Sequence, residues 1–330
     1  MTVLKVENIV VDFATRRGNA RVLDHVNLEV NEGEILGIVG ESGCGKSMTA
    51  LSIMGLVPSP PGQLTSGSIY LEGRDLVGLS KDEMRDIRGN EIGMIFQEPM
   101  SSLNPVFTVG EQIAESVRLH ENASPRAAWD RAVEMLRAVG IPEAEARAKS
   151  YPHQLSGGMR QRVMIAIALA CNPRVLIADE PTTALDTTVQ AQIFDLLEDL
   201  QKSRGTAIVL ITHDMGAVAQ LADRVAVMYA GRIVETGTVE EVLTKPRHPY
   251  TAGLIACVPH LQPDPPEVRE PLLEIPGVVP SLTELGEGCA FAPRCNRALP
   301  ECTRRQPVLK AESGGHATAC WAVEAELENV

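Results

Sequence analysis

A short glycine-rich segment near the start of the chain has the residue types that bind nucleotide phosphates. Gly40, Gly45, Lys46 and Ser47 occupy the fixed positions of the pattern Gly-x-x-x-x-Gly-Lys-Ser/Thr. Glycines allow successive backbone N–H groups to surround phosphate oxygens, and the N-terminus of a following helix adds partial positive charge. We expect Lys46 to contact the β- and γ-phosphates and the Ser47 hydroxyl to ligate Mg²⁺. The segment therefore predicts a nucleotide site.

Two adjacent carboxylates, Asp179 and Glu180, directly follow the apolar run Val175–Ala178. In a parallel sheet, residues at the carboxyl end of a strand lie beside such a phosphate loop. We expect Asp179 to hold Mg²⁺, through a water molecule. Glu180, one residue later, is placed to polarise a water molecule for attack on the γ-phosphate.

The elements that must position these groups alternate between strands and helices. Short apolar or alternating runs predict strands at Val6–Phe13, Val26–Val30, Ile35–Val39, Ile69–Leu71, Ile92–Phe96, Val175–Ala178 and Ala207–Thr212. Helical patterns cover Met48–Met54, Thr108–Ala148 and Val163–Ala170. Alternation of this kind predicts an α/β fold with a parallel sheet.

A second phosphate-binding surface is predicted at the segment Leu155–Met159, which reads Leu-Ser-Gly-Gly-Met. Ser156 has the side chain of a helix N-cap, and Gly157 and Gly158 let a phosphate approach the exposed N–H groups of the helix that follows. One nucleotide can contact two phosphate-binding surfaces if the second surface belongs to another subunit.

With this segment the chain resembles the ATP-binding cassette (ABC) family, whose signature motif is LSGGQ; Met159 replaces the glutamine. The other motifs follow in the order of that family. Gln97 lies in a segment similar to the Q-loop, Asp186 in one similar to the D-loop, and His213 matches the switch histidine. Phe13 matches the aromatic residue that stacks on adenine.

The resemblance implies an α/β P-loop NTPase fold: a RecA-like parallel sheet core, an antiparallel β subdomain and a helical signature subdomain. On this basis residues 1–255 form the nucleotide-binding domain, with the helical subdomain at about 100–165. Residues 256–330 form a small Cys-rich C-terminal extension of the type found in oligopeptide importers.

The resemblance also implies an ATPase in which two cassettes enclose two ATP molecules head to tail. The catalytic residues would be Glu180, His213 and Gln97, and Mg²⁺ would contact Ser47, Gln97 and Asp179. The residues expected to contact ATP in the same chain are Phe13, Gly40, Ser42, Gly43, Cys44, Gly45, Lys46, Ser47, Met48, Gln97 and Asp179. Those expected to face the ATP of the partner cassette are Ser156, Gly157, Gly158, Met159 and Asp186.

Two longer segments, Gln97–Pro105 and Arg247–Thr251, resemble the dipeptide and oligopeptide importer branch, which also includes importers of nickel, glutathione and haem precursors. This implies two transmembrane permease subunits, an extracytoplasmic substrate-binding protein and a second cassette ATPase, with a heterodimer expected. Residues 97–110 would receive a coupling helix of the permease. The chain is then expected peripherally at the cytoplasmic face of the inner membrane.

The composition agrees with this expectation. The chain has 330 residues, with 43 Asp and Glu against 30 Lys and Arg, and a formal net charge of −13. Such an acidic chain is a poor candidate for direct binding of nucleic acid. No apolar run approaches the roughly 20 residues that cross a bilayer, and the N-terminus carries no signal peptide pattern. We therefore expect a cytosolic protein.

Two other functions fit part of this pattern. A soluble ABC ATPase that acts on nucleic acid or ribosomes usually carries two cassettes in one chain or a long coiled-coil insertion, and this sequence has neither. A nucleotide sensor without turnover is disfavoured because Glu180 and His213 are both present.

Four of the seven cysteines lie close to the C-terminus, at Cys289, Cys295, Cys302 and Cys320. Four thiolates suffice for a [4Fe–4S] cluster or a tetrahedral zinc ion. Structural zinc sites usually use cysteine pairs separated by two to four residues, a spacing that is missing here, so we favour the cluster. Disulfides and free thiols remain open.

Other side chains near these cysteines could contribute. His316 is a candidate spare ligand. The arginines between and after the cysteines could offset thiolate charge; they are Arg294, Arg297, Arg304 and Arg305.

Overall fold

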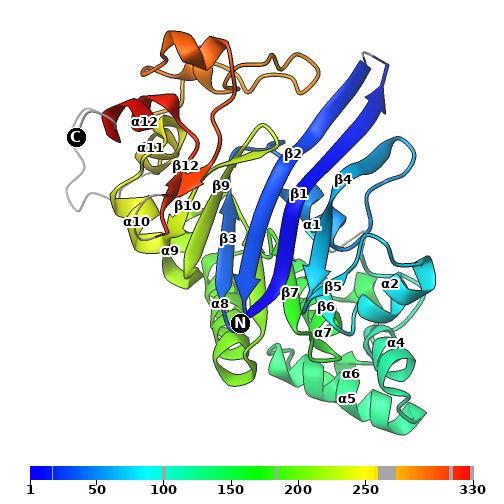
Figure 1. Cartoon of the computed structure of the whole chain (residues 1–330). Coiled ribbons are helices and arrows are strands. Elements are labelled where there is room, and N and C mark those ends of the chain that lie inside the picture. Colours follow the sequence, from blue (N-terminus) through cyan, green and yellow to red (C-terminus); the bar gives the residue numbers. More distant parts are fainter. Residues whose placement is uncertain (17, 99–101, 183–184, 259–272, 312–314, 328–330) are drawn as a thin grey trace, which may run out of the picture.

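The computed structural model describes residues 1–16, 18–98, 102–182, 185–258, 273–311 and 315–327. Its N-terminal part forms an antiparallel sheet in the strand order β2-β1-β4-β5 (Figure 1). These strands are β1 (Thr2–Thr15), β2 (Gly18–Asn31), β4 (Gly62–Leu71) and β5 (Arg74–Asp75). β1 and β2 are longer than the sequence predicts, because their alternating pattern continues into a hairpin that projects from the molecule.

A second sheet carries the nucleotide-binding loop. Its order is β11-β12-β10-β9-β3-β8-β7-β6, and the five strands from β9 to β6 are parallel. The strands are β3 (Ile35–Val39), β6 (Ile92–Ile95), β7 (Val175–Asp179), β8 (Ala207–Ile211), β9 (Arg224–Tyr229), β10 (Arg232–Thr238), β11 (Lys310–Ala311) and β12 (Ala317–Thr318). Every residue of β3, β7 and β8 is buried, as expected of parallel strands covered on both faces.

Helices surround this sheet. They are α1 (Lys46–Ile53), α2 (Lys81–Ile87), α4 (Val109–Glu121), α5 (Pro125–Ala138), α6 (Ala144–Arg147), α7 (Gly157–Leu169), α8 (Thr187–Arg204), α9 (Met215–Leu221), α10 (Val239–Thr244), α11 (Pro249–Ala256) and α12 (Trp321–Leu327). Three 3₁₀ turns complete the set: η1 (Pro152–Gln154), η2 (Ala292–Arg294) and η3 (Pro300–Thr303). Among the described residues, no helix is long and apolar enough to span a membrane.

The helical run predicted over Thr108–Ala148 is three helices in the structure. α4 ends at Asn122, which adopts a left-handed conformation, a conformation that ends many helices. The Ser124 side chain then caps α5, which begins with Pro125. A second left-handed residue, Glu143, precedes α6. Local turn chemistry therefore divides one apolar pattern into three short helices.

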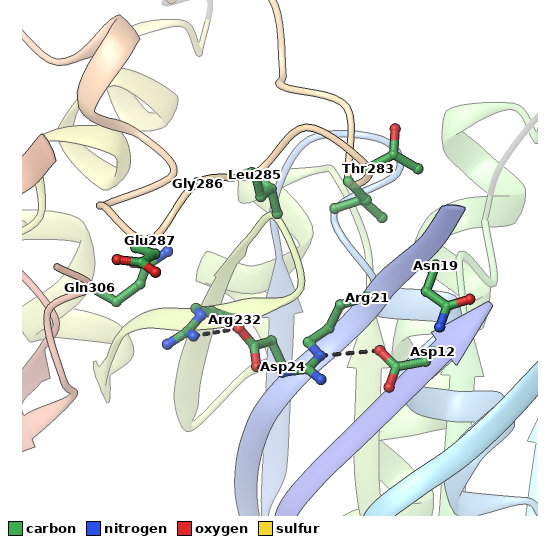
Figure 2. Close-up of a pocket in the computed structure, with 11 residues that line it drawn as sticks. Asp12, Asn19, Arg21, Asp24, Arg232, Thr283, Leu285, Gly286, Glu287 and Gln306 are labelled. Carbon is green, nitrogen blue, oxygen red and sulfur yellow. Dashed lines mark hydrogen bonds and ion pairs between the residues drawn. The ribbon is translucent and has the colours of Figure 1, made fainter. Parts of the chain in front are cut away.

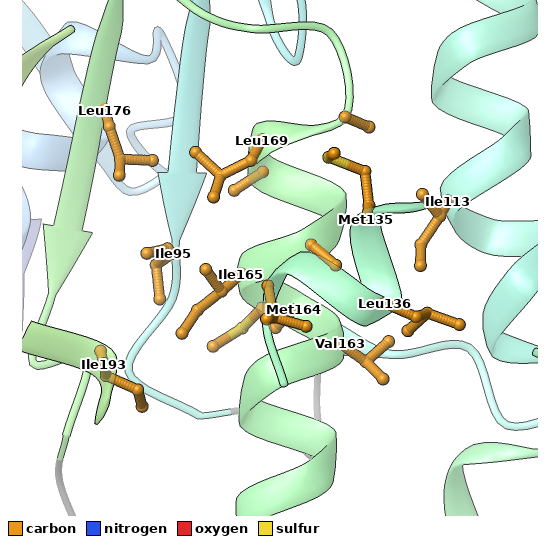
Figure 3. Close-up of a cluster of buried hydrophobic side chains, with 14 of the residues drawn as sticks. Ile95, Ile113, Met135, Leu136, Val163, Met164, Ile165, Leu169, Leu176 and Ile193 are labelled. Carbon is orange, nitrogen blue, oxygen red and sulfur yellow. The ribbon is translucent and has the colours of Figure 1, made fainter. Parts of the chain in front are cut away.

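These helices form a separate layer at one end of the molecule (Figure 1). Figure 3 shows the core that joins them to the parallel sheet. Leu136 of α5 and Val163 of α7 pack there with Ile95 of β6. Because α7 is part of this core, the segment just before it is held at a fixed place relative to the sheet.

The C-terminal extension is built onto the opposite end of the sheet (Figure 1). Its strand β12 pairs antiparallel with β10, with Glu235 opposite Thr318. A further core cluster joins Phe291 of the extension to Tyr229 and Tyr250. The extension is therefore continuous with the nucleotide-binding part in both its sheet and its core.

Candidate functional site

The phosphate loop follows β3 and ends in α1, as the sequence predicts. Gly40 has a φ of +152°, and a Cβ atom there would lie 2.2 Å from the carbonyl oxygen of Met228. No larger residue fits at this position without movement of β9. Ser42 and Gly43 are exposed at the outside of the loop, whereas Cys44 is buried beneath it. Burial raises the pKa of the Cys44 thiol, so this cysteine stays protonated and unreactive.

Lys46 lies inside the loop and is only 6% exposed. Its Nζ donates hydrogen bonds to the carbonyl oxygens of Gly40 (2.8 Å) and Glu41 (3.2 Å). A buried ammonium needs such partners. Phosphate oxygens offer this cation stronger, charged acceptors than the two carbonyls do, so Lys46 is held ready for an anionic ligand.

Ser47 and Asp179, two of the three residues expected to contact Mg²⁺, lie side by side. The Ser47 hydroxyl donates a hydrogen bond of 3.1 Å to Asp179 Oδ1, although the residues lie in different elements, α1 and β7. Burial raises the pKa of Asp179, the Ser47 hydrogen bond opposes that rise, and the charge of Glu180 adds to it. A hydroxyl beside a partly desolvated carboxylate suits Mg²⁺, which prefers hard oxygen ligands.

The three predicted catalytic side chains meet at Glu180. Gln97 Nε2 donates to Glu180 Oε2 at 3.0 Å, and His213 Nδ1 lies 3.2 Å from Glu180 Oε1. Glu180 is 14% exposed and His213 is 64% exposed, so the carboxylate is enclosed while the imidazole faces solvent. The backbone of Glu180 has a φ of +49°, a conformation that non-glycine residues rarely adopt. Such outliers often occur at functional sites.

The signature segment begins α7. The Ser156 side chain accepts a hydrogen bond from Met159 N at 3.3 Å and is the N-cap that the sequence predicts. Ser156 and Gly157 are exposed, so another chain can reach the end of this helix. Gln161, on the same helix, donates to the carbonyl oxygen of Pro181 at 2.6 Å. This buried bond connects the signature helix to the turn that follows Glu180.

Two other predicted contacts have internal partners in the structure. Asp186 is the N-cap of α8, and its carboxylate accepts a hydrogen bond from Val189 N at 2.9 Å. Phe13 is half-buried in β1 and packs against Gly62, where a Cβ atom would lie 2.6 Å from the phenyl ring. Residues 99–101 of the Q-loop region and Ala184 of the D-loop region lie outside the described residues.

The four C-terminal cysteines lie near one another, each with backbone donors. Burial raises the pKa of the Cys289 thiol to about 11. Hydrogen bonds from N–H groups of the next turn oppose this rise, and the charges of Cys302 and Cys320 add to it. Burial also raises the pKa of Cys320, and Cys295 adds to that rise. Arg297 N donates to Cys295 Sγ at 3.3 Å, and Leu299 N donates to Cys302 Sγ at 3.4 Å.

These thiols are not arranged as a metal site. All seven cysteines lie in the described part of the chain and are free. Within that part, no group of three or more Cys, His, Asp or Glu side chains is placed to hold a metal ion. His316, the candidate spare ligand, instead lies with its Nε2 2.7 Å from Oε1 of the buried Glu235. The prediction of a [4Fe–4S] or zinc site is thus not supported by the geometry.

A cavity of about 610 Å³ separates the extension from the β1–β2 hairpin (Figure 2). Its walls carry the ion pairs Arg21–Asp12 and Arg232–Asp24, opposite Leu285 and its neighbours in the extension. It includes no residue of the phosphate loop. This cavity therefore does not coincide with the predicted nucleotide site.

Sequence reasoning missed a contact between the extension and the phosphate loop. Arg294, which we expected to offset thiolate charge, instead forms an ion pair with Glu41. Tyr250, inside the distinctive Arg247–Thr251 segment, accepts a hydrogen bond from Glu41 N at 2.8 Å. The unusual Arg-His-Pro-Tyr-Thr segment was the available signal for Tyr250. Arg294 lies in the Gly-Cys-Ala-Phe-Ala-Pro-Arg-Cys segment that resembles the same branch, but no pattern indicated Glu41 as its partner.

Known proteins match both halves of the chain. A family described as ABC transporter matches residues 23–183, and one described as oligopeptide/dipeptide transporter, C-terminal region, matches residues 234–302. The oligopeptide transport ATP-binding protein OppD of Bacillus subtilis (strain 168) is 52% identical over 99% of this chain and 90% of its own length. The dipeptide transport ATP-binding protein DppD of the same organism is 47% identical over 99% of this chain and 96% of its own length.

Solved structures agree with these sequence comparisons. The dimeric structure of MJ0796, a bacterial ABC transporter cassette, superimposes with a TM-score of 0.65 at 32% identity and covers 72% of this chain and 98% of its own. A post-hydrolysis state of the same cassette, bound to ADP and Pi, gives a TM-score of 0.66. The α/β P-loop fold predicted from the motifs is therefore confirmed. The chain belongs to the family of ABC transporter ATP-binding proteins that carry the oligopeptide/dipeptide transporter C-terminal region.

Proposed function

We propose that this chain is the ATP-hydrolysing subunit of an importer that takes up dipeptides and oligopeptides across the cytoplasmic membrane. The observation that carries the ATPase part is the enclosed Glu180 carboxylate between Gln97 and His213. The peptide part rests on the similarity to the oligopeptide and dipeptide transport proteins OppD and DppD and on the matching C-terminal region.

Within the chain, each proposed role follows from a contact. Lys46 exchanges its two carbonyl partners for the β- and γ-phosphates of ATP. Ser47 and Asp179 would hold Mg²⁺, with Gln97 as a further ligand, and the ion would offset phosphate charge. Glu180 acts as the general base that takes a proton from the attacking water. His213 orients that carboxylate and contacts the γ-phosphate.

The remaining motif requires a second cassette. Ser156 and Gly157 are exposed at the N-terminus of α7, where backbone N–H groups favour an anion. We infer that Ser156, Gly157, Gly158, Met159 and Asp186 face the ATP of a partner cassette in a head-to-tail dimer. A related but different ATPase subunit is the proposed partner.

A docking surface for the permease is proposed on residues 97–110. Val106 and Phe107 are 70% and 50% exposed in this segment. Exposed apolar side chains next to each other commonly mark interaction sites. Two transmembrane permease subunits and an extracytoplasmic substrate-binding protein would complete the importer. The chain would then lie at the cytoplasmic face of the inner membrane.

Reconstitution tests this function. The chain, its partner ATPase and two permease subunits are placed in liposomes with the binding protein, and uptake of a labelled dipeptide or pentapeptide is measured. We expect ATP-dependent uptake that Glu180→Gln abolishes. Uptake of nickel, glutathione or a haem precursor instead of peptides would reassign the substrate within the branch. ATPase activity stimulated by RNA or ribosomes, without permeases, would contradict the importer.

We further propose that Cys289, Cys295, Cys302 and Cys320 bind a metal group when one is supplied, with [4Fe–4S] favoured over zinc. Each sulfur is already faced by backbone N–H donors, which stabilise metal-bound thiolates. The thiols would have to converge from the arrangement described above.

Anaerobic purification followed by iron, sulfide and zinc analysis tests the metal proposal. We expect a brown protein with about four irons per chain and broad absorption near 400 nm, lost in Cys289→Ser and kept in Cys257→Ser. A colourless protein, with zinc or without metal, would contradict the cluster.

A further inference from the structure

The side chain of Arg294 crosses from the C-terminal extension to the phosphate loop. Its Nη1 and Nη2 donate to the two carboxylate oxygens of Glu41 at 2.7 and 3.0 Å. The arginine side chain is 4% exposed. The Glu41 side chain is 27% exposed, so the buried partner of the pair is the guanidinium. A bidentate pair of this kind is both stronger and more directional than a fully exposed ion pair.

The guanidinium is fixed on the extension side as well. Nε donates to the carbonyl oxygen of Pro276 at 2.8 Å, and Nη2 donates to that of Ile275 at 3.2 Å. The group also lies 5.9 Å from the ring centres of Tyr229 and Phe291. Arg294 is therefore anchored to the extension independently of its contact with Glu41.

Glu41 is held at three places by three different elements. Arg294 holds its carboxylate, Tyr250 Oη accepts from its N–H at 2.8 Å, and Lys46 Nζ donates to its carbonyl oxygen at 3.2 Å. When Lys46 turns to the phosphates of ATP, the third contact is lost, and the carbonyl oxygen keeps only the hydrogen bond from Cys44 N at 3.3 Å within the loop. The contacts that then hold Glu41 from outside the loop are those of Arg294 and Tyr250.

The charge of Glu41 gives the ion pair a second consequence. Glu41 is the second residue of the phosphate loop, so its carboxylate brings negative charge to a site for anions. An opposite charge in direct contact offsets that field. Without Arg294, the loop would present an unpaired carboxylate near the incoming phosphates.

We propose that Arg294 is a positioning residue for the phosphate loop, through which the C-terminal extension sets the affinity of the same chain for ATP. This inference rests on the proposed ATPase function. It gives the extension a role in nucleotide binding that does not depend on any metal at its cysteines.

Equilibrium titration of the full chain with Mg·ATP and a fluorescent ATP analogue tests the proposal. We expect Arg294→Gln to raise the Kd for ATP about 5-fold or more, in the usual range of coupling between sites. Arg294→Lys keeps the positive charge but loses the bidentate contact, so it should raise the Kd for ATP by less. Arg305→Gln is the matched control, because Arg305 lies in the same extension with its ion pair exposed.

The double variant Glu41→Gln/Arg294→Gln separates positioning of the loop from the unpaired charge of Glu41. Removing the carboxylate should bring the Kd only part of the way back to the wild-type value, because the charge is gone but the loop still lacks the contact that positions it. KM for ATP should follow Kd, with kcat changed less. A folded Arg294→Gln chain with wild-type Kd, or a double variant with wild-type Kd, would overturn the inference.

Two results distinguish failure of the Arg294 proposal from failure of the proposed ATPase function. If Arg294→Gln does not fold, the comparison of Arg294→Lys with Arg305→Gln decides, and equal Kd values for these two overturn the proposal. If the wild-type chain itself binds no ATP, the proposed ATPase function is wrong.

Discussion

The nucleotide site and the C-terminal extension place their polar groups in different ways. In the nucleotide site, Lys46 contacts groups of its own loop, and Ser47, Asp179 and Glu180 lie at the ends of neighbouring elements. In the extension, the best-buried polar contacts reach far along the chain. Arg294 and Glu41 are 253 positions apart, and His316 and Glu235 are 81 apart. Long-range contacts occur in both regions, since Ser47 and Asp179 are 132 positions apart. The difference is that the residues of the first region each lie in a contiguous motif, whereas no motif indicates how the residues of the second are paired.

This difference predicts different consequences of mutation. A change at Glu180 should alter chemistry with little effect on folding, because its partners Gln97 and His213 are themselves site residues. A change at Glu235, the fully buried partner of His316, should alter stability first. The predictions below test this separation from the largest expected effect to the smallest.

Glu180→Gln should lower ATP turnover by about 10²–10⁴-fold, the range that removal of a general base gives. ATP binding should remain, since Lys46 and Ser47 are unchanged. Steady-state phosphate release and nucleotide titration measure the two effects. Glu240→Gln, an exposed glutamate of α10, is the control and should retain full turnover.

Glu235→Gln should destabilise the chain by about 3 kcal/mol, because an amide would place a donor against donors in a buried site. The carboxylate is fully buried and accepts from the backbone N–H groups of Arg247 and His248, with His316 Nε2 also 2.7 Å away. Urea unfolding measures the loss. Glu287→Gln, in an exposed part of the extension, should change stability by less than about 0.5 kcal/mol. Equal losses of stability in Glu235→Gln and Glu287→Gln would contradict the special role of the buried carboxylate.

Stability should fall below neutral pH because of His248. Burial lowers the pKa of this histidine to about 4, against about 6.5 in an unfolded chain. Between these values the unfolded chain binds a proton that the folded chain does not, so the free energy of unfolding falls as the pH falls. The slope is about 1.4 kcal/mol per pH unit, and the contribution is complete above pH ~6.5.

Urea unfolding at several pH values measures this slope. His248→Asn keeps an acceptor for the N–H of Tyr250 at the start of α11 and should flatten the dependence. His153→Gln, an exposed histidine, should leave it intact. A wild-type stability that is constant from pH 7 to 5 would contradict the prediction.

Asp186 tests whether a predicted ATP contact also has a local structural role. Asp186→Ala should lower stability by about 1 kcal/mol through loss of the N-cap of α8, whereas asparagine caps equally well. Thermal unfolding compares the two variants. An equal loss in Asp186→Asn would show that the cap is not what Asp186 contributes.

Much of the nucleotide site was predictable because its residues lie in contiguous sequence motifs. The strand Ile35–Val39 matches β3 residue for residue, and the loop and α1 follow at once. Glu180 is predicted from the apolar run before it and His213 from motif order, whereas the contact between them is a finding of the structure. These features depend on local patterns and on strands of five buried residues, which sequence patterns report well.

The rest depends on pairings that local patterns do not encode. β12 has two residues and is defined by its pairing with β10 and β11. The partner of Arg294 could not be predicted, because arginines among cysteines are equally compatible with solvent, thiolates or a distant carboxylate. The arrangement of the four cysteines depends on the same tertiary packing.

The position of β12 also has a consequence for how the chain is made. β10 is paired with β9 on one side and with β12 on the other, and Thr318 emerges long after Glu235 during synthesis. Until then β10 is an open strand edge, which can template pairing with another chain. β12 thus covers this edge at Glu235 and Thr236. Truncation before β12 should yield a chain that folds its nucleotide site yet associates through β10, and nascent chains should need shielding until β12 has been made.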